Sequence, residues 1–391
     1  MMATSRAQRV LMIRWNGPAL FRNLVTLANG LQRNGWDVTI ASVVDDPQQD
    51  VSLLSSIRRL AFESMGDGVG RSLAMRVRRL NWLCRVLRDS APDLIYVMDS
   101  WTLPLFIPAR LLAGRSADCP WVYHTVDWIE PHRHPVHAWV ERWACHHAAR
   151  VINTDRSRAR MQQAIYRLKE TPLFMPNYLS LNETVPGPDN SLRLELLPGL
   201  GSSDRQLLVN PTMASPTRMV LELIRALAAT DPRICLLQFV VDSTYGRECR
   251  RLVADLHLEN RVHFHEPVSY RDIMRMVACA DLGVIFHDHR PSSGYFMCNA
   301  DRLGLYAACG LPCIASDYPN MEALVYRHGL GECCNPYDPE SVSVTLTRMM
   351  ADPERLAAYR KRVREAFQSD LNFEAHGGRL LEALQRVVAA S

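Results

Sequence analysis

Residues 299–316, NADRLGLYAACGLPCIAS, place three polar side chains at the start of a run that favours a helix. These side chains belong to Asn299, Asp301 and Arg302. The run stops at Gly310, and an apolar strand follows it. A helix N-terminus has unpaired N–H groups and about half a positive charge, and both suit a phosphate. The stretch therefore predicts a phosphate contact, with an ordinary helix of an α/β domain as the alternative.

A second polar group follows the apolar segment 281–286, which favours a strand. Its members are His287, His289 and Arg290. Ser293 and Gly294 come next and form a turn whose backbone N–H groups can approach a phosphate. The two groups are close in sequence, so we expect them near one site.

The elements that position these groups alternate between apolar strands and amphipathic helices. In the first half the predicted strands cover 9–14, 36–43, 93–98, 119–123 and 150–154. In the second half they cover 206–210, 233–241, 261–264, 281–286 and 313–315. Strands separated by helices indicate parallel sheets with right-handed crossovers, so we predict an α/β fold. Ligands of such sheets bind beyond the carboxyl ends of the strands, where several of these polar residues fall.

The length of 391 residues favours two domains rather than one. Pro, Gly, Asp and Asn gather between the two series of strands, which predicts a linker over 181–204. The expected domains are then 1–180 and 205–371. Two such domains would place a ligand-binding cleft between them.

The composition is that of an ordinary soluble globular protein, 48% hydrophobic and 22% charged, with a formal net charge of +4. That charge is mild, and aromatic and basic residues do not interleave, so we expect no nucleic-acid partner. The eleven cysteines lack paired metal-ligand spacing, and buried free thiols in a reducing cytoplasm are the simplest interpretation. The first apolar run, 10–13, is too short for a secretory signal, and no run approaches the roughly 18 apolar residues of a membrane span.

Arginine is concentrated in residues 58–88, where acidic neighbours are few. The arginines there are Arg58, Arg59, Arg71, Arg76, Arg78, Arg79, Arg85 and Arg88. Such a run is either the solvated face of a helix or a surface for an anionic membrane or acceptor. The functional interpretation is a peripheral contact with the inner face of the membrane.

Several short motifs of the second half occur in a fixed order. VHFHEPVSYRDIMRMVACADLGVIFHD is followed by LYAACGLPCIASDYPNMEALVYRHGLGECCNPYDPESV. The Ala280-Asp281 pair before a strand, the Gly-Leu-Pro at 310–312 and the segment 322–331 resemble the GT-B glycosyltransferases. The resemblance is to their large retaining group, the glycosyl transferases group 1, and it covers nearly the whole chain.

This resemblance implies two Rossmann-like domains that face a central cleft, with residues 1–180 on the acceptor side and 205–371 binding the donor. The C-terminal helix, 372–391, is expected to complete the first domain. The implied enzyme moves a sugar from a nucleoside diphosphate sugar to a hydroxyl group of a glycan, a lipid-linked acceptor or a small molecule. It needs no cofactor and no metal. A non-catalytic partner subunit and a nucleotide-sugar isomerase remain as alternatives, and the sequence names neither base nor sugar.

The resemblance also assigns residues to the donor. Arg218 falls on the phosphate-contacting Lys of the family, and Arg302 falls where a subset of the family has a Lys. Both would neutralise the departing diphosphate. Gly17 falls on a glycine-containing loop near the diphosphate. Because the family does not rely on a divalent ion, the implied lining of the donor-sugar pocket is His287, His289 and Arg290.

The chain departs from the family at its Glu-x7-Glu pair, which falls on Met297 and Leu305. The second Glu normally binds the ribose hydroxyls, and a leucine cannot do so. Asn299 and Asp301 are close enough in sequence to supply these contacts instead. The stereochemistry, retaining or inverting, therefore stays open. The residues expected around the nucleoside are His265, Glu266 and Leu305.

The strand-end text WVYHTVD is similar to a segment of the xanthan-type glucuronosyltransferases that carries an Asp base. Asp127 matches that Asp, and His124 matches the active-site His of the retaining group. Either group can be tuned to take the proton of the acceptor hydroxyl. An N-cap or a satisfied polar residue is the alternative. A solvated loop, rather than a metal site, is expected for His132, His134 and His137.

Overall fold

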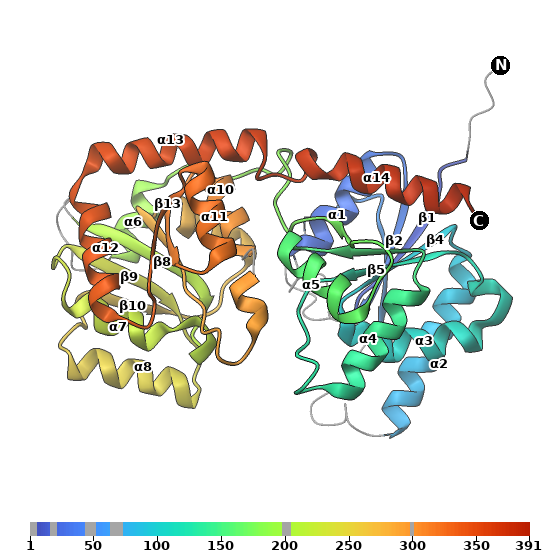
Figure 1. Ribbon diagram of the computed structural model, residues 1–391. Helices are drawn as coiled ribbons and strands as arrows, with labels where there is room; N and C mark the ends of the chain where they lie inside the picture. The colour runs from blue at the N-terminus through green and yellow to red at the C-terminus, as the bar shows by residue number, and fades with distance from the viewer. Residues whose placement is uncertain (1–5, 16–21, 44–51, 63–72, 198–204, 298–300) are drawn as a thin grey trace, which may run out of the picture. The chain divides into compact units, whose positions relative to one another are not determined.

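The computed structural model describes residues 6–15, 22–43, 52–62, 73–197, 205–297 and 301–391 (Figure 1). The chain forms two compact units. Unit 1 comprises Met1–Ser180 together with Phe373–Ser391, and unit 2 comprises Leu181–Asn372. The chain therefore leaves unit 1 after Ser180 and returns to it at Phe373.

Unit 1 contains a seven-stranded parallel sheet in the order β3-β2-β1-β4-β5-β6-β7. Its strands are β1 (Arg9–Ile13), β2 (Asp37–Val43), β3 (Arg58–Phe62), β4 (Leu94–Met98), β5 (Trp121–Thr125), β6 (Arg150–Asn153) and β7 (Leu173–Phe174). The strand order reverses between β1 and β4. The carboxyl ends of these two strands therefore flank the crevice in which open parallel sheets bind ligands.

Helices cover both faces of this sheet. On one face α1 (Arg22–Arg33) and α14 (Glu374–Ala389) share an apolar cluster through Leu24, Leu31 and Leu380. Figure 1 shows α14, the last helix of the chain, beside α1. The helices that pack on the other face are α2 (Leu73–Ser90), α3 (Leu103–Ala113) and α4 (Pro135–His147), whereas α5 (Arg156–Tyr166) follows β6.

Unit 2 contains a six-stranded parallel sheet in the order β10-β9-β8-β11-β12-β13. Its strands are β8 (Gln206–Met213), β9 (Ile234–Phe239), β10 (Val262–His265), β11 (Leu282–Ile285), β12 (Cys313–Ser316) and β13 (Gly331–Cys334). The order reverses between β8 and β11, so the carboxyl ends of these strands form the switch point of this sheet.

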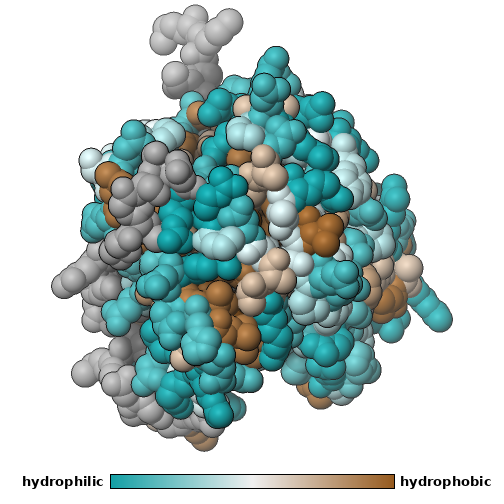
Figure 2. Space-filling view, turned by 90° about the vertical axis from the view of Figure 1, so that its left-hand side faces the viewer, coloured by the Kyte–Doolittle hydropathy of each residue, from teal (hydrophilic) through white to brown (hydrophobic). Residues whose placement is uncertain are grey.

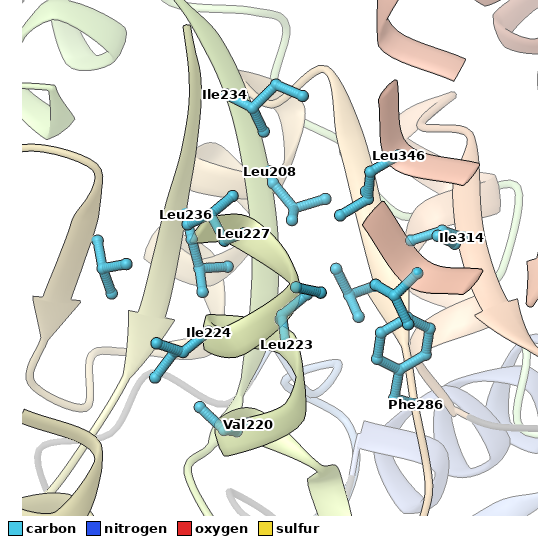
Figure 3. Packing of buried hydrophobic residues seen from close by; sticks show 14 of the residues in the cluster. Leu208, Val220, Leu223, Ile224, Leu227, Ile234, Leu236, Phe286, Ile314 and Leu346 are labelled. Carbon is cyan, nitrogen blue, oxygen red and sulfur yellow. The ribbon is translucent and has the colours of Figure 1, made fainter. Parts of the chain in front are cut away.

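The helices of unit 2 are α6 (Asn190–Leu196), α7 (Val220–Ala228), α8 (Thr244–Asp255), α9 (Tyr270–Ala278), α10 (Asp301–Cys309), α11 (Pro319–His328), α12 (Pro339–Ala351) and α13 (Pro353–Ser369). Figure 3 shows Leu223 and Leu227 of α7 pointing toward Leu208 of β8 and Leu346 of α12. These apolar side chains recur at helical spacing on α7, which explains why that helix lies flat on the sheet.

Two expectations need correction. The range 181–204, predicted as a linker, contains α6, and Arg193 of that helix forms an ion pair of 2.6 Å with Asp281 of unit 2. Part of the range therefore packs as structure rather than connecting freely. Arg58 and Arg59, which the solvated-helix interpretation placed on a helix, lie on β3 at the edge of the first sheet. Charged side chains are typical of such an edge because they discourage further strand pairing.

The face of the molecule shown in Figure 2 is mostly polar. On the face shown in Figure 2, apolar residues form separate patches within a hydrophilic surround. Among the described residues, no helix combines the length and the apolar character that crossing a membrane requires.

Phe373 begins the part of the chain that returns to unit 1, and its ring lies against two glycines. A Cβ on Gly30 would lie 2.2 Å from Cζ of this ring, and one on Gly377 would lie 2.8 Å from Cε1. We expect Gly30→Ala to destabilise unit 1 by about 1–3 kcal/mol, because the ring must move. Urea unfolding followed by tryptophan fluorescence measures this change, since all eight tryptophans belong to unit 1. Gly378→Ala is the control because nothing lies within 4 Å of its Cβ; equal losses in the two variants would contradict the prediction.

Candidate functional site

Arg302 lies at the switch point of unit 2, between the carboxyl ends of β8 and β11. It is the second residue of α10 and is only 7% exposed. Its Nη1 donates to Asn210 Oδ1 at 2.9 Å and to Val284 O at 2.7 Å, and its Nη2 donates to Phe286 O at 3.1 Å. One guanidinium therefore ties the end of β8 to the end of β11.

These contacts exclude the alternative that Arg302 is an ordinary arginine of the helix surface, and its contact with a diphosphate stays a prediction. A buried guanidinium needs acceptors for its N–H groups, and the carbonyls at the end of β11 provide them. Its Nη2 also lies 3.2 Å from His287 Nε2. His287 is itself only 3% exposed, so it does not line an open pocket as predicted. Both residues hold the strand ends that surround the site.

His289 lies in an aromatic cluster directly after β11. Its ring centroid is 4.3 Å from that of Phe296, 5.5 Å from that of Tyr318 and 5.3 Å from that of Tyr337. The hydroxyl oxygen of Tyr337 lies 2.8 Å from His289 Nδ1. The ring is thus fixed at the carboxyl edge of the sheet, at the junction of β11, β12 and β13.

Arg290 is the exposed cation of this edge. Its Nε lies 2.8 Å from Asp288 Oδ1, and its Nη2 lies 2.7 Å from Asp288 Oδ2. This two-point contact lowers the pKa of Asp288 to about 2. The Arg290 side chain is 66% exposed and packs over the ring of Tyr337 at 5.0 Å. It is therefore oriented by its partners while remaining open to a ligand.

Arg218 ends a short 3₁₀ turn, Pro216–Arg218, that follows β8. The turn is fixed to the end of β11 because the N–H of Asp288 donates to Thr217 O at 3.0 Å. Met219, the next residue, is fully buried with a φ of 53°, a conformation that a non-glycine residue rarely adopts. The half-buried side chain of Arg218 has no hydrogen-bond or ion-pair partner among the described residues. It is therefore a cation at the switch point that no described residue engages.

Some of the remaining residues predicted to bind the donor are described by the structure, and others are not. Gly17 and Asn299 lie outside the described residues, as does the side chain of Ser293. Asp301 is exposed at the start of α10, and the N–H of Gly294 donates to Ser292 Oγ at 3.2 Å.

The residues predicted to surround the nucleoside differ in their exposure to solvent. Leu305 is only 5% exposed, so its prediction as a nucleoside contact is wrong: its side chain belongs to the buried face of α10. His265 is the last residue of β10, and its Nδ1 lies 2.8 Å from Glu266 O. Glu266 itself is exposed. Contact of this loop with a base stays a prediction.

In unit 1, the two candidates for the catalytic base have very different environments. His124 is the penultimate residue of β5 and is only 2% exposed, and the hydroxyl oxygen of Tyr96 lies 2.9 Å from its Nδ1. Burial, together with the charge of Arg14, lowers the pKa of His124 to about 3. Asp127, two residues after β5, is exposed and has no hydrogen-bond or ion-pair partner among the described residues. Asp127 is therefore accessible to solvent, whereas His124 is almost fully buried.

The switch point of unit 1 holds a buried ion pair that the sequence analysis missed. Arg14 Nη2 lies 3.0 Å from Asp99 Oδ2, and the two side chains are 0% and 5% exposed. Asp99 has a φ of 72°, and its N–H donates to His124 O at 3.0 Å. The pair thus joins the ends of β1, β4 and β5. The positions of Arg14 and Asp99 could have indicated a site, since each residue directly follows an apolar strand.

No group of three or more His, Cys, Asp or Glu side chains in the described part of the chain is arranged to hold a metal ion. His132, one of the three histidines after β5, has its Nδ1 3.6 Å from Glu130 Oε2. The ten described cysteines are free thiols.

Comparisons with known proteins agree with this geometry. Residues 22–167 match the family model described as a glycosyl transferase 4-like domain, and residues 214–366 match glycosyl transferases group 1. No curated protein matches the chain.

Solved structures match over nearly the whole chain. HepE of Anabaena, in complex with UDP and glucose, is 19% identical with a TM-score of 0.73, covering 97% of this chain and 100% of that one. Sucrose-phosphate synthase of Thermosynechococcus elongatus is 17% identical with a TM-score of 0.76, covering 98% and 100%. WaaG, a glycosyltransferase involved in lipopolysaccharide biosynthesis, is 15% identical with a TM-score of 0.67, covering 95% and 98%. At these identities the likeness shows a common fold.

Proposed function

We propose a donor, an acceptor and site residues for this chain, which belongs to the group 1 glycosyltransferases of GT-B fold and transfers a sugar from a nucleotide sugar. The donor we propose is a UDP-sugar, and the acceptor is a hydroxyl group. The UDP-bound and UDP-glucose-bound structures of HepE support the choice of base.

Arg218 carries the donor-side proposal. It lies after β8 at the switch point, on a turn fixed to β11, and no described residue engages its guanidinium. A diphosphate leaving group develops charge as the glycosidic bond breaks, and a fixed cation stabilises that charge. Arg290 supplies a second cation at the same edge of the sheet, oriented by Asp288.

We expect Arg218→Ala to weaken the binding of UDP about tenfold to a hundredfold, because charge-assisted hydrogen bonds contribute about 1.5–3 kcal/mol. Isothermal titration calorimetry with UDP measures the change. Arg225→Ala is the matched control, since Arg225 is exposed on α7, the next helix. Equal affinities in Arg218→Ala and in the unchanged protein would remove Arg218 from the donor site.

Asp301 replaces the missing ribose-binding carboxylate in this proposal. The family's second Glu falls on Leu305, whose side chain is buried. Asp301 is exposed one turn earlier on α10, at the end of the helix that faces the switch point. Its carboxylate can accept the ribose hydroxyls that leucine cannot.

We propose that Asp127 is the catalytic base rather than His124. A base must reach the acceptor hydroxyl, and Asp127 is exposed whereas His124 is buried and bonded to Tyr96. Depression of the pKa of His124 to about 3 also makes that imidazole a weak base.

We further propose that unit 1 contacts the cytoplasmic face of an anionic membrane through α2. Leu73 is 76% exposed and Val77 is 47% exposed, so apolar and basic groups share the surface of this helix. A cavity of about 380 Å³ beside α2 is lined by Ala61, Phe62, Arg78, Asn81, Trp82 and Arg85. Neither Arg78 nor Arg85 has a hydrogen-bond or ion-pair partner among the described residues.

The double variant Arg78→Ala/Arg85→Ala should bind vesicles of phosphatidylserine and phosphatidylcholine at least about tenfold more weakly, since each basic residue near such a surface contributes about 1 kcal/mol. Co-sedimentation measures the binding. The control, Arg142→Ala/Arg160→Ala, removes two exposed arginines from α4 and α5. A loss of similar size in the control would mean that net charge, rather than α2, directs the contact.

A further inference from the structure

Trp101 is a large aromatic residue left exposed at the carboxyl edge of the unit 1 sheet. It lies in a 3₁₀ turn, Ser100–Thr102, that follows β4. Asp99 caps this turn by accepting the N–H of Trp101 at 3.3 Å. The Trp101 residue is 53% exposed, although the residues on both sides of it, Ser100 and Thr102, are fully buried. The backbone is therefore held firmly while the indole faces solvent.

Two histidines from the start of α4 extend this aromatic surface. The ring of His137 lies 4.1 Å from the indole of Trp101 at an interplanar angle of 47°, and that of His134 lies at 6.1 Å and 76°. The two imidazoles lie against the indole, so the three rings form one aromatic surface.

The aromatic surface lies beside the proposed base. Trp101 follows β4 and Asp127 follows β5, and these two strands pair directly, with Met98 opposite His124. The N–H of Asp99, between β4 and Trp101, donates to His124 O at 3.0 Å, three residues before Asp127. An exposed carboxylate and an exposed indole thus follow neighbouring strands at one edge of the sheet.

We propose that Trp101 and His137 form a platform on which a pyranose ring of a glycan acceptor packs, with its reactive hydroxyl directed toward Asp127. A pyranose has an apolar face of C–H groups and a polar rim of hydroxyls. The C–H face, slightly positive, packs against the negative face of an aromatic ring. This inference rests on the proposed function and narrows its acceptor to a sugar, in preference to a lipid or an aglycone.

Binding of the acceptor is tested without turnover by saturation-transfer NMR on the full chain with a panel of methyl pyranosides and disaccharides. The variants are Trp101→Ala, Trp101→Phe and, as control, Trp139→Ala, which removes a tryptophan that is 67% exposed on α4. We expect the protein and Trp139→Ala to bind at least one of these sugars. Trp101→Ala should bind it about threefold to tenfold more weakly, and Trp101→Phe should retain most of the affinity, as expected for packing on an aromatic face.

The platform is overturned if no sugar of the panel binds, or if Trp101→Ala binds as well as the unchanged protein. Calorimetry with UDP on the same samples separates this outcome from failure of the proposed function. If the protein binds UDP and Trp101→Ala leaves sugar binding unchanged, the platform is rejected but the proposed function is not. Absence of UDP binding rejects the proposed donor, whereas a sugar signal that depends on Trp101 supports the platform in either case.

Discussion

Asp127→Asn is expected to lower the rate of sugar transfer about 10²- to 10⁴-fold while leaving the affinity for UDP unchanged. The loss has this size because a positioned base contributes that much to proton transfer, and an amide cannot accept the proton. Asp127 is exposed just beyond β5, in unit 1, whereas the proposed diphosphate contact, Arg218, belongs to unit 2. The two substitutions should therefore have different effects. Asp127→Asn should lower the rate of transfer, and Arg218→Ala should weaken donor binding.

The measurement is the initial rate of transfer from the UDP-sugar to a hydroxyl acceptor, with UDP affinity determined in parallel. Asp118→Asn is the matched control, because Asp118 is an exposed aspartate near the opposite, amino end of β5. Transfer at the original rate by Asp127→Asn would exclude Asp127 as the base. A similar drop in His124→Gln, with Asp127→Asn active, would reassign the role to His124.

Asp99→Asn should destabilise unit 1 by about 3–5 kcal/mol. The substitution keeps the shape of the side chain, but the fully buried, charged guanidinium of Arg14 loses its carboxylate partner. Removing one member of a buried ion pair is costlier than removing both, because desolvation of the remaining charge is no longer offset.

The double variant Arg14→Met/Asp99→Asn therefore provides the control. It should recover most of the lost stability, because no buried charge remains. Urea unfolding followed by tryptophan fluorescence reports on unit 1 alone, as for Gly30→Ala. If the double variant is as unstable as Asp99→Asn, the ion pair is not the source of the effect, and the strained backbone at Asp99 is the better explanation.

The alternation of strands and helices was predictable because it depends on local pattern. The apolar runs that became β1, β4 and β11 were recognisable within five or six residues, and their parallel pairing followed from the intervening helices. The boundary of β5 was displaced to Trp121–Thr125 from the predicted 119–123. Pro120, which has no N–H, cannot donate to the sheet, so regular pairing begins after it.

The direction of polar side chains was not predictable in the same way. Arg302 was correctly placed at the start of a helix, but its burial depends on Asn210, which is 92 residues away in sequence. The pairing of Arg14 with Asp99 likewise spans 85 residues. Sequence pattern indicates which strand a residue follows, but whether the side chain turns inward depends on acceptors that only the folded sheet brings together.

The return of the chain to unit 1 at Phe373 has a consequence for its biosynthesis. A ribosome completes all of unit 2, residues 181–372, before it makes the segment that carries Phe373 and α14. During that interval the face of the first sheet that packs against Leu380 and Leu384 is uncovered. The first unit therefore cannot complete its fold until the whole of unit 2 has been synthesised. The nascent unit 1 exposes apolar surface for that period, which is when a chaperone would bind it.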